Sequence, residues 1–132
     1  MIHKHPLCPE RLRRVPERFS WVDHRLVRDH HLRGLHPEAA ALYLFLLVVS
    51  DSRGLSHYGE AAITRATGLS EDSIARARRG LVSAGLIAHQ RPLVQVLDLA
   101  PPGRSPEANR DAVTLGELFR RVMAAKEGGR DD

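Results

Sequence analysis

One apolar run constrains the fold of this chain more than any other feature. The segment "AAALYLFLLVV", Ala39 to Val49, contains 11 residues and no charge. A helix that spans a bilayer needs about 20 such residues, so the run is too short to cross a membrane. Pro37 and Glu38 precede it directly, and both residue types favour the first turn of a helix. The sequence therefore predicts a helix that is buried within a small domain.

Length and composition narrow the class of protein. A chain of 132 residues fits one compact domain with extra material at its ends. Aromatic residues make up only 5% of it, which argues against a platform on which single-stranded bases stack. Cys8 is the single cysteine, so an internal disulfide and a cysteine-rich zinc site are excluded. This usage, together with an N-terminus that lacks a secretory signal, predicts a cytoplasmic protein.

The formal charge of +4 is concentrated in the first quarter of the chain. Residues 1–35 contain eight Lys and Arg against four Asp and Glu, whereas the two charge types balance in the remainder. A basic arm on a neutral body favours an anionic partner, most often nucleic acid. We expect Arg11, Arg13 and Arg14 to contact phosphate, and the alternative is a solvated tail.

Sequence signals divide the chain into four parts. Residues 1–18 are expected to form a flexible basic arm, because they combine prolines and arginines without an apolar period. A domain follows over 19–99, in which the apolar helix precedes a short extended piece over 54–58 and a second helix around 59–67. In that second helix we expect Ile63 and Ala66 to point inward. A linker over 100–110 and a C-terminal amphipathic helix and tail over 111–132 complete the chain.

A third helix is predicted over 70–84. Ser70 is a favourable N-cap, Glu71 and Asp72 suit the first turn, and Gly85 suits a left-handed C-terminal position. Two short apolar runs then flank Arg91-Pro92, which is typical of a tight hairpin. On a helical wheel the buried face of this helix is predicted to contain Ile74, Ala77, Leu81 and Ala84. The opposite face is predicted to contain Ser73, Arg76, Gly80 and Ser83, with Asp72 and Arg79 beside it.

The segment "AITRATGLSEDSIARARRGLVSAGLIAHQ" resembles the winged helix-turn-helix pattern. In that pattern a short helix and a "GLS" turn lead to a recognition helix, and "LI" opens the first strand of the wing. The preceding segment "LHPEAAALYLFLLVVSDSRGLSHYG" is similar to bacterial replisome-organiser and primosomal winged-helix modules. It is also similar to small bacterial helix-turn-helix proteins, some of them encoded beside mobile elements. The resemblance covers residues 19–99 and implies a mainly α fold with a small β wing.

The resemblance implies a double-stranded-DNA-binding protein, and in particular a bacterial transcriptional regulator. Arginine suits this role because its planar guanidinium can bond phosphate or the edge of guanine through two hydrogen bonds. Positions that contact DNA in the family fall on these residues of the chain: Ser70, Asp72, Ser73, Arg76, Arg79 and, in the wing, Arg91. Arg65 is expected to flank them on the DNA backbone. The alternative is a replication- or transposition-accessory module that acts mainly through protein contacts.

The C-terminal segment carries a separate amphipathic pattern. Its apolar positions recur at helical spacing: Leu115, Leu118, Phe119, Val122 and Met123. We expect this helix to pair with its twin in a homodimer, because dimeric helix-turn-helix proteins bind two half-sites. The alternative is that it packs on its own domain.

Other chemistries find little support in the sequence. The histidines lack the spacing and the additional ligands of a tetrahedral metal site. Ser56, His57 and Asp51 lie close in sequence, yet no glycine-flanked nucleophile elbow surrounds the serine. No glycine-rich phosphate loop is present. We therefore expect no catalysis, no cofactor and no metal.

Overall fold

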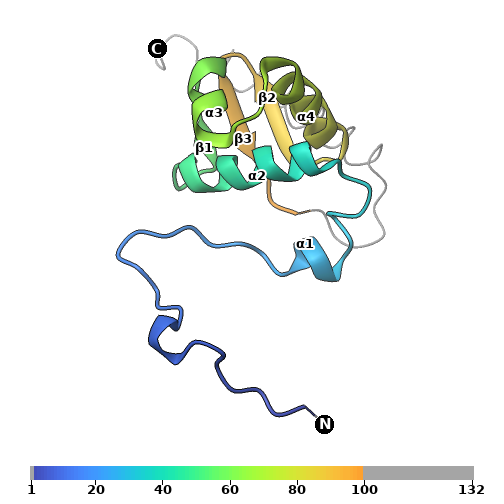
Figure 1. The fold of residues 1–132 in the computed structure, drawn as a ribbon. Coiled ribbons are helices and arrows are strands. Elements are labelled where there is room, and N and C mark those ends of the chain that lie inside the picture. The colour runs from blue at the N-terminus through green and yellow to red at the C-terminus, as the bar shows by residue number, and fades with distance from the viewer. Residues whose placement is uncertain (1, 100–132) are drawn as a thin grey trace, which may run out of the picture.

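The computed structural model describes residues 2–99, and it is mainly helical with one small antiparallel sheet (Figure 1). The elements run in the order η1 (Pro9–Arg11), α1 (Arg25–Arg28), α2 (Pro37–Val49), β1 (Leu55–Ser56), α3 (Glu60–Thr67), α4 (Glu71–Ser83), β2 (Ile87–Gln90) and β3 (Leu93–Val96). The predicted combination of helices with a small β element is confirmed. The linker expected over 100–110 and the helix expected over 111–132 lie outside the described residues.

Helix α2 is the central element, and it begins at Pro37 as predicted. One side of the helix is buried, through Ala39, Leu42, Tyr43 and Leu46. The opposite side leaves Leu44 and Val48 exposed. The prediction of a buried helix therefore holds for one face only. Because the run is apolar on every side, its outer face presents aliphatic groups to solvent.

The turn after α2 explains where the helix ends. Asp51 accepts hydrogen bonds from the backbone N–H groups of Arg53 and Leu55, at 2.8 and 3.0 Å. These bonds lower the pKa of the Asp51 carboxyl. Gly54 follows with a φ of +84°, a conformation that favours glycine. A Cβ at this position would lie 2.6 Å from the carbonyl oxygen of Val96, so a residue with a side chain does not fit the turn.

Helices α3 and α4 are joined by the short turn of Gly68, Leu69 and Ser70. Gly68 has a φ of +79°, which ends α3. Ser70 caps α4 as predicted, because its Oγ accepts a hydrogen bond from the backbone N–H of Ser73 at 3.1 Å. In α3, Ile63 is buried as expected. Ala66 is exposed, so the prediction that it points inward is wrong.

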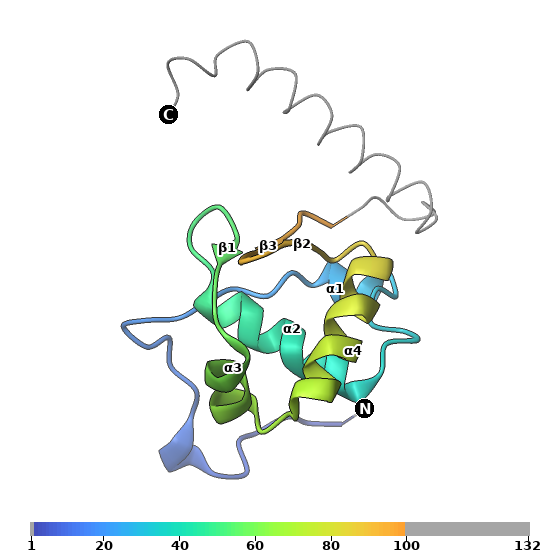
Figure 2. The same cartoon turned by 90° about the horizontal axis from the view of Figure 1, so that it is seen from above.

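The three strands form an antiparallel sheet in the order β1-β3-β2. Strands β2 and β3 make the predicted hairpin: Gln90 pairs with Leu93, and Arg91-Pro92 form the turn. Strand β1 adds to the free edge of β3 through the pair Ser56 and Val94. In Figure 2 the sheet lies along one side of the body, and α2, α3 and α4 all lie on the same face of the sheet.

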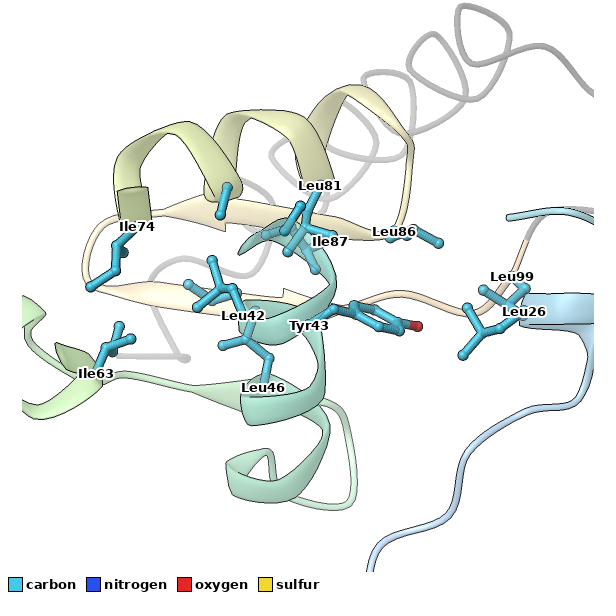
Figure 3. Close-up of a cluster of buried hydrophobic side chains, with 13 residues drawn as sticks. Leu26, Leu42, Tyr43, Leu46, Ile63, Ile74, Leu81, Leu86, Ile87 and Leu99 are labelled. Carbon is cyan, nitrogen blue, oxygen red and sulfur yellow. The ribbon is translucent and has the colours of Figure 1, made fainter. Parts of the chain in front are cut away.

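The core lies between α2, α4 and the inner face of the sheet (Figure 3). Ile74 and Leu81 from α4 are completely buried. They pack with Leu42 from α2 and Ile87 from β2 in one hydrophobic cluster. The cluster extends toward α1, where Leu26 and Leu99 face each other beside the ring of Tyr43. The buried face predicted for the third helix is thus confirmed at its first three positions, Ile74, Ala77 and Leu81, while Ala84 is half-buried.

The N-terminal part of the chain joins the body through α1. Asp23 accepts a hydrogen bond from the backbone N–H of Arg25 at 2.9 Å, and its carboxylate also pairs with the Arg25 guanidinium at 2.8 Å. These contacts lower the pKa of Asp23 to about 2. Residues 2–22 are exposed throughout and run away from the body in Figure 1. Within residues 2–99, no helix has both the length and the apolar character to cross a membrane.

Candidate nucleic-acid interface

The solvent-facing stripe of α4 is the main candidate for contact with nucleic acid. Four side chains of this helix are exposed at spacings of three or four residues: Asp72, Arg76, Arg79 and Ser83. Together they cover about three turns on the side of α4 opposite the core. Two guanidinium groups therefore project from the outer surface of a helix whose other face is anchored in the core.

This exposed stripe differs in one respect from the predicted face. Ser73 and Gly80 were expected to lie at its centre, but both are half-buried. A Cβ at Gly80 would lie 3.9 Å from the Cβ of Ala39, so this flank of α4 packs beside the first turns of α2. The predicted placement of Ser73 and Gly80 is therefore wrong. Because wheel analysis treats one helix alone, it could not show which flank a neighbouring helix covers.

Arg76 forms an ion pair that joins α4 to α2. Its Nε donates to Oε1 of Glu38 at 3.2 Å, and its Nη2 donates to Oγ of Ser73 at 3.2 Å. The Arg76 side chain remains 54% exposed, and that of Glu38 is 26% exposed. Hydrogen bonding to Arg76, with a smaller contribution from Ser73, lowers the pKa of the Glu38 carboxyl. The nearest acid one turn back on α4, Asp72, is not the partner of Arg76.

The two neighbouring arginines of α4 occupy different environments. The Arg78 side chain is only 13% exposed, and its Nη2 donates to Oε1 of Glu60 at 2.8 Å. This bond joins α4 to the first turn of α3. Arg79 is exposed. Of these two residues, Arg79 is available to a partner, whereas Arg78 holds two helices together.

The hairpin turn and α3 contribute two further exposed arginines, Arg91 and Arg65. Arg91 lines a hollow of about 280 Å³ together with Glu60, Arg78, His57 and His89. Burial, followed by the nearby charges of Arg78 and Arg91, lowers the pKa of His89. The hairpin turn thus adds positive charge beside the helix pair. Sequence reasoning did not anticipate the two histidines here, because His57 follows β1 whereas His89 lies in β2, far along the chain.

The arm arginines are not brought to this surface. Arg11, Arg13 and Arg14 are all exposed. In Figure 1 the arm runs past α1, on the far side of α2 from α3 and α4. Residues 2–22, which comprise the arm and the first residues of the predicted domain, also expose large apolar side chains, a feature to which sequence reasoning gave no weight: Ile2, Leu7, Leu12, Val15, Phe19, Trp21 and Val22. The structure therefore gives this segment a mixed basic and apolar surface.

The remaining predicted site residues lie beyond the described part of the chain. These are the five apolar positions of the proposed dimer helix: Leu115, Leu118, Phe119, Val122 and Met123. Among residues 2–99, no cluster of three or more His, Cys, Asp or Glu has the geometry to hold a metal ion. Comparison of the chain with family models, with curated proteins and with solved structures gives no match.

Proposed function

We propose that this chain is a double-stranded-DNA-binding protein of the winged helix-turn-helix class, with α4 as the recognition helix. The order of elements supports this proposal. From α2 to β3 the order of elements is a helix, a short strand, two helices joined by a tight turn, and then a hairpin. This is the order in which the class builds its helix-turn-helix and wing. Within the class, we propose a transcriptional regulator.

The exposed stripe of α4 is the observation that carries the proposal. Arg76 and Arg79 project from one side of a helix whose opposite side is fixed by Ile74 and Leu81. A major groove is wide enough to admit an α-helix, and arginine recognises guanine through two acceptors on its edge. A rigid helix that presents two guanidinium groups one turn apart is therefore suited to read base edges.

The other expected contacts follow if α4 lies in the major groove. Ser70 and Ser73 lie at the start of α4, where a backbone phosphate could accept hydrogen bonds. Arg65 and Arg91 would flank the helix on the phosphate backbone. Asp72 lies in the same stripe and would repel phosphate, but its carboxylate could accept a hydrogen bond from the amino group of cytosine. A homodimer would place two such helices on successive half-sites.

A second function is favoured by the exposed N-terminal segment, residues 2–22. Its exposed apolar side chains, Phe19 and Trp21 among them, form a surface of the kind that proteins use to contact other proteins. A replication- or transposition-accessory module that works mainly through protein contacts would use this surface. In that case α4 would contribute little to the interaction.

The proposal is tested by fluorescence anisotropy with a random-sequence DNA duplex at several salt concentrations, followed by selection and sequencing. We expect a steep salt dependence and an enriched sequence. With the selected site, Arg79→Ala should weaken binding by about 1–3 kcal/mol if the residue reads a base. If it contacts phosphate instead, binding should weaken on all sequences and the salt slope should fall by about one.

Arg53→Ala is the matched control, because it also removes one exposed arginine but lies on the turn between α2 and β1. Equal affinity of the Arg79→Ala and parent proteins for the selected site would reject α4 as the reading element. Absence of binding at low salt would reject DNA as the partner and favour the protein-contact function.

A further inference from the structure

A groove lies beside α4 and shares Arg76 and Ser83 with the exposed stripe. It runs between α4 and the segment that leads into α2, and its volume is about 500 Å³. This volume lies within the range of small-molecule sites, which is roughly 300–1,000 Å³. The turn that follows α1 closes one side of it through His31, Arg33 and Leu35.

The floor of the groove is apolar and made of small side chains. Ala77, Gly80 and Ala84 line it from α4, and Ala39 lines it from α2. Gly80 lies in the interior of a helix, where glycine is less favourable than alanine. A Cβ there would meet nothing closer than the Cβ of Ala39 at 3.9 Å, so packing does not require glycine. The absent side chain leaves the floor of the groove open.

The rim of the groove is positively charged. Arg33 and Arg76 lie on it with one carboxylate, that of Glu38, and Glu38 is already paired with Arg76. The two hydrogen bonds of Arg76 use Nε and Nη2, and neither uses Nη1. The groove therefore offers a guanidinium group to an anion that lies on its apolar floor.

One polar atom at the groove is buried without a hydrogen-bond partner among the described residues. This atom is Nε2 of His31, a residue that lines the groove. A buried polar atom that lacks a partner is destabilising. The residue before it, His30, adopts a φ of +63°, which is uncommon outside glycine. Because Nε2 is enclosed by protein atoms, a ligand in the open groove does not reach it, and the groove depends on Arg76 for its polar contact.

We propose that this groove binds a small carboxylate with an apolar body. The Arg76 guanidinium holds the carboxylate, and the body of the molecule covers Ala77, Gly80 and Ala84. A carboxylate fits better than a neutral ligand because it supplies a charged acceptor to the guanidinium. The apolar floor gives an inorganic anion little to contact, so the apolar body distinguishes this ligand class.

Binding of such a ligand affects the α4 stripe, because Arg76 belongs to both sites. A carboxylate in the groove competes with Glu38 for the guanidinium and holds it away from the outer surface. DNA affinity therefore falls when the groove is filled. This coupling rests on the proposed DNA-binding function, whereas binding in the groove does not.

The groove is tested by NMR titration of the full chain with phenylacetate as the probe, and with 2-phenylethanol as its uncharged counterpart. We expect phenylacetate to shift the amides of Ala77, Gly80 and Ala84 in a saturable manner. 2-Phenylethanol should bind at least about tenfold more weakly, because it lacks the charge that strengthens the hydrogen bonds. Equal binding of the two probes, or no saturable shift with either, would overturn the proposal.

Two variants test whether phenylacetate binds in the groove or elsewhere on the surface. Gly80→Leu fills the floor and should abolish phenylacetate binding, whereas Ala66→Leu adds the same kind of side chain on the exposed side of α3 and should bind as the parent does. A folded Gly80→Leu protein that still binds like the parent would refute the site. If Gly80→Leu does not fold, Arg76→Gln replaces it. The affinity of Arg76→Gln for phenylacetate should be about tenfold lower than that of the parent, and so close to the parent's affinity for 2-phenylethanol. An unchanged affinity for phenylacetate would count against the proposal.

The coupling has its own measurement. Duplex affinity is compared with and without saturating phenylacetate, and we expect it to fall with the probe. Equal duplex affinities would overturn the coupling while leaving the groove intact. A chain that binds no duplex at all would reject the proposed function, and the NMR titration would still decide on the groove.

Discussion

Glu38 in the first turn of α2 and Arg76 in the middle of α4 are joined by an ion pair, with Nε 3.2 Å from Oε1. This pair holds the guanidinium against the groove flank of α4. It therefore competes with any contact that Arg76 makes on the outside of the molecule. The charge available to a partner depends on a carboxylate that belongs to another helix.

Glu38→Gln should free Arg76 and raise duplex affinity. We expect a gain of roughly twofold to fivefold, the range that weak surface ion pairs allow. The measurement is fluorescence anisotropy at constant salt. Asp98→Asn removes the same charge from an exposed site after β3, so it corrects for the change in net charge. A gain no larger than that of the control would mean that the pair does not restrain Arg76.

Ser70→Ala should destabilise the domain. The Ser70 Oγ accepts the N–H of Ser73, and removal of an N-cap of this kind costs about 1 kcal/mol. Urea unfolding followed by circular dichroism measures the change. Ser70→Asp retains an acceptor at the cap and should keep most of the stability. If Ser70→Ala and Ser70→Asp lose the same stability, the capping bond is not the cause.

Gly54→Ala should also destabilise the domain, but through the backbone. The added Cβ would lie 2.6 Å from the Val96 carbonyl oxygen, and the φ of +84° is strained for alanine. We expect a loss of about 1–3 kcal/mol in the free energy of unfolding. An unfolding midpoint equal to that of the parent would show that the turn can rearrange at little cost.

Gly80→Ala should have the opposite effect. Its Cβ would make ordinary contact with Ala39 at 3.9 Å, and alanine favours the helix interior. The free energy of unfolding should rise by about 0.5–1 kcal/mol. Urea unfolding measures the free energy of unfolding of this variant and of Gly54→Ala, so that the same substitution, glycine to alanine, is compared at two sites. A loss of stability would imply that the groove floor is packed more tightly than these distances indicate.

The Asp23 carboxylate predicts a pH-dependent contribution to stability. Its pKa is lowered from 3.8 to about 2 by the hydrogen bonds of Arg25, so the folded state favours the ionised form. The contribution is complete above the unfolded pKa and is lost as the pH falls through about 2. Asp23→Asn should therefore be less stable than the parent at roughly pH 5 and should approach it near pH 2. A difference that stays constant over this interval would contradict the assignment.

Local signals were sufficient to predict α2, α3, α4 and the hairpin, but not η1. The apolar run with Pro37, the N-cap at Ser70 and the turn at Arg91-Pro92 all act between residues close in sequence. The α4 core positions followed from helical period alone, since a helix has only one way to bury Ile74 and Leu81 together. These features depend on neighbours within a few residues, which a sequence displays directly.

The contacts between elements could not be predicted in this way. Arg76 with Glu38 and Arg78 with Glu60 are pairs whose members belong to different helices. Ala66 was expected to be buried because alanine spacing matches Ile63, but an eight-residue helix buries only a narrow stripe. The groove at His31 requires the turn after α1 to lie against α4. Each of these depends on the packing angle of two elements, and no local pattern encodes that angle.

The meeting of Leu26 with Leu99 at one end of the core has a mechanical consequence. The short α1 is attached to the body partly through Leu99, which lies three residues beyond β3. A shortened protein that stops at Val96 would retain β1, β2 and β3 and still lose this contact. Leu99 thus contributes to the core, although residues 97–99 belong to no helix or strand.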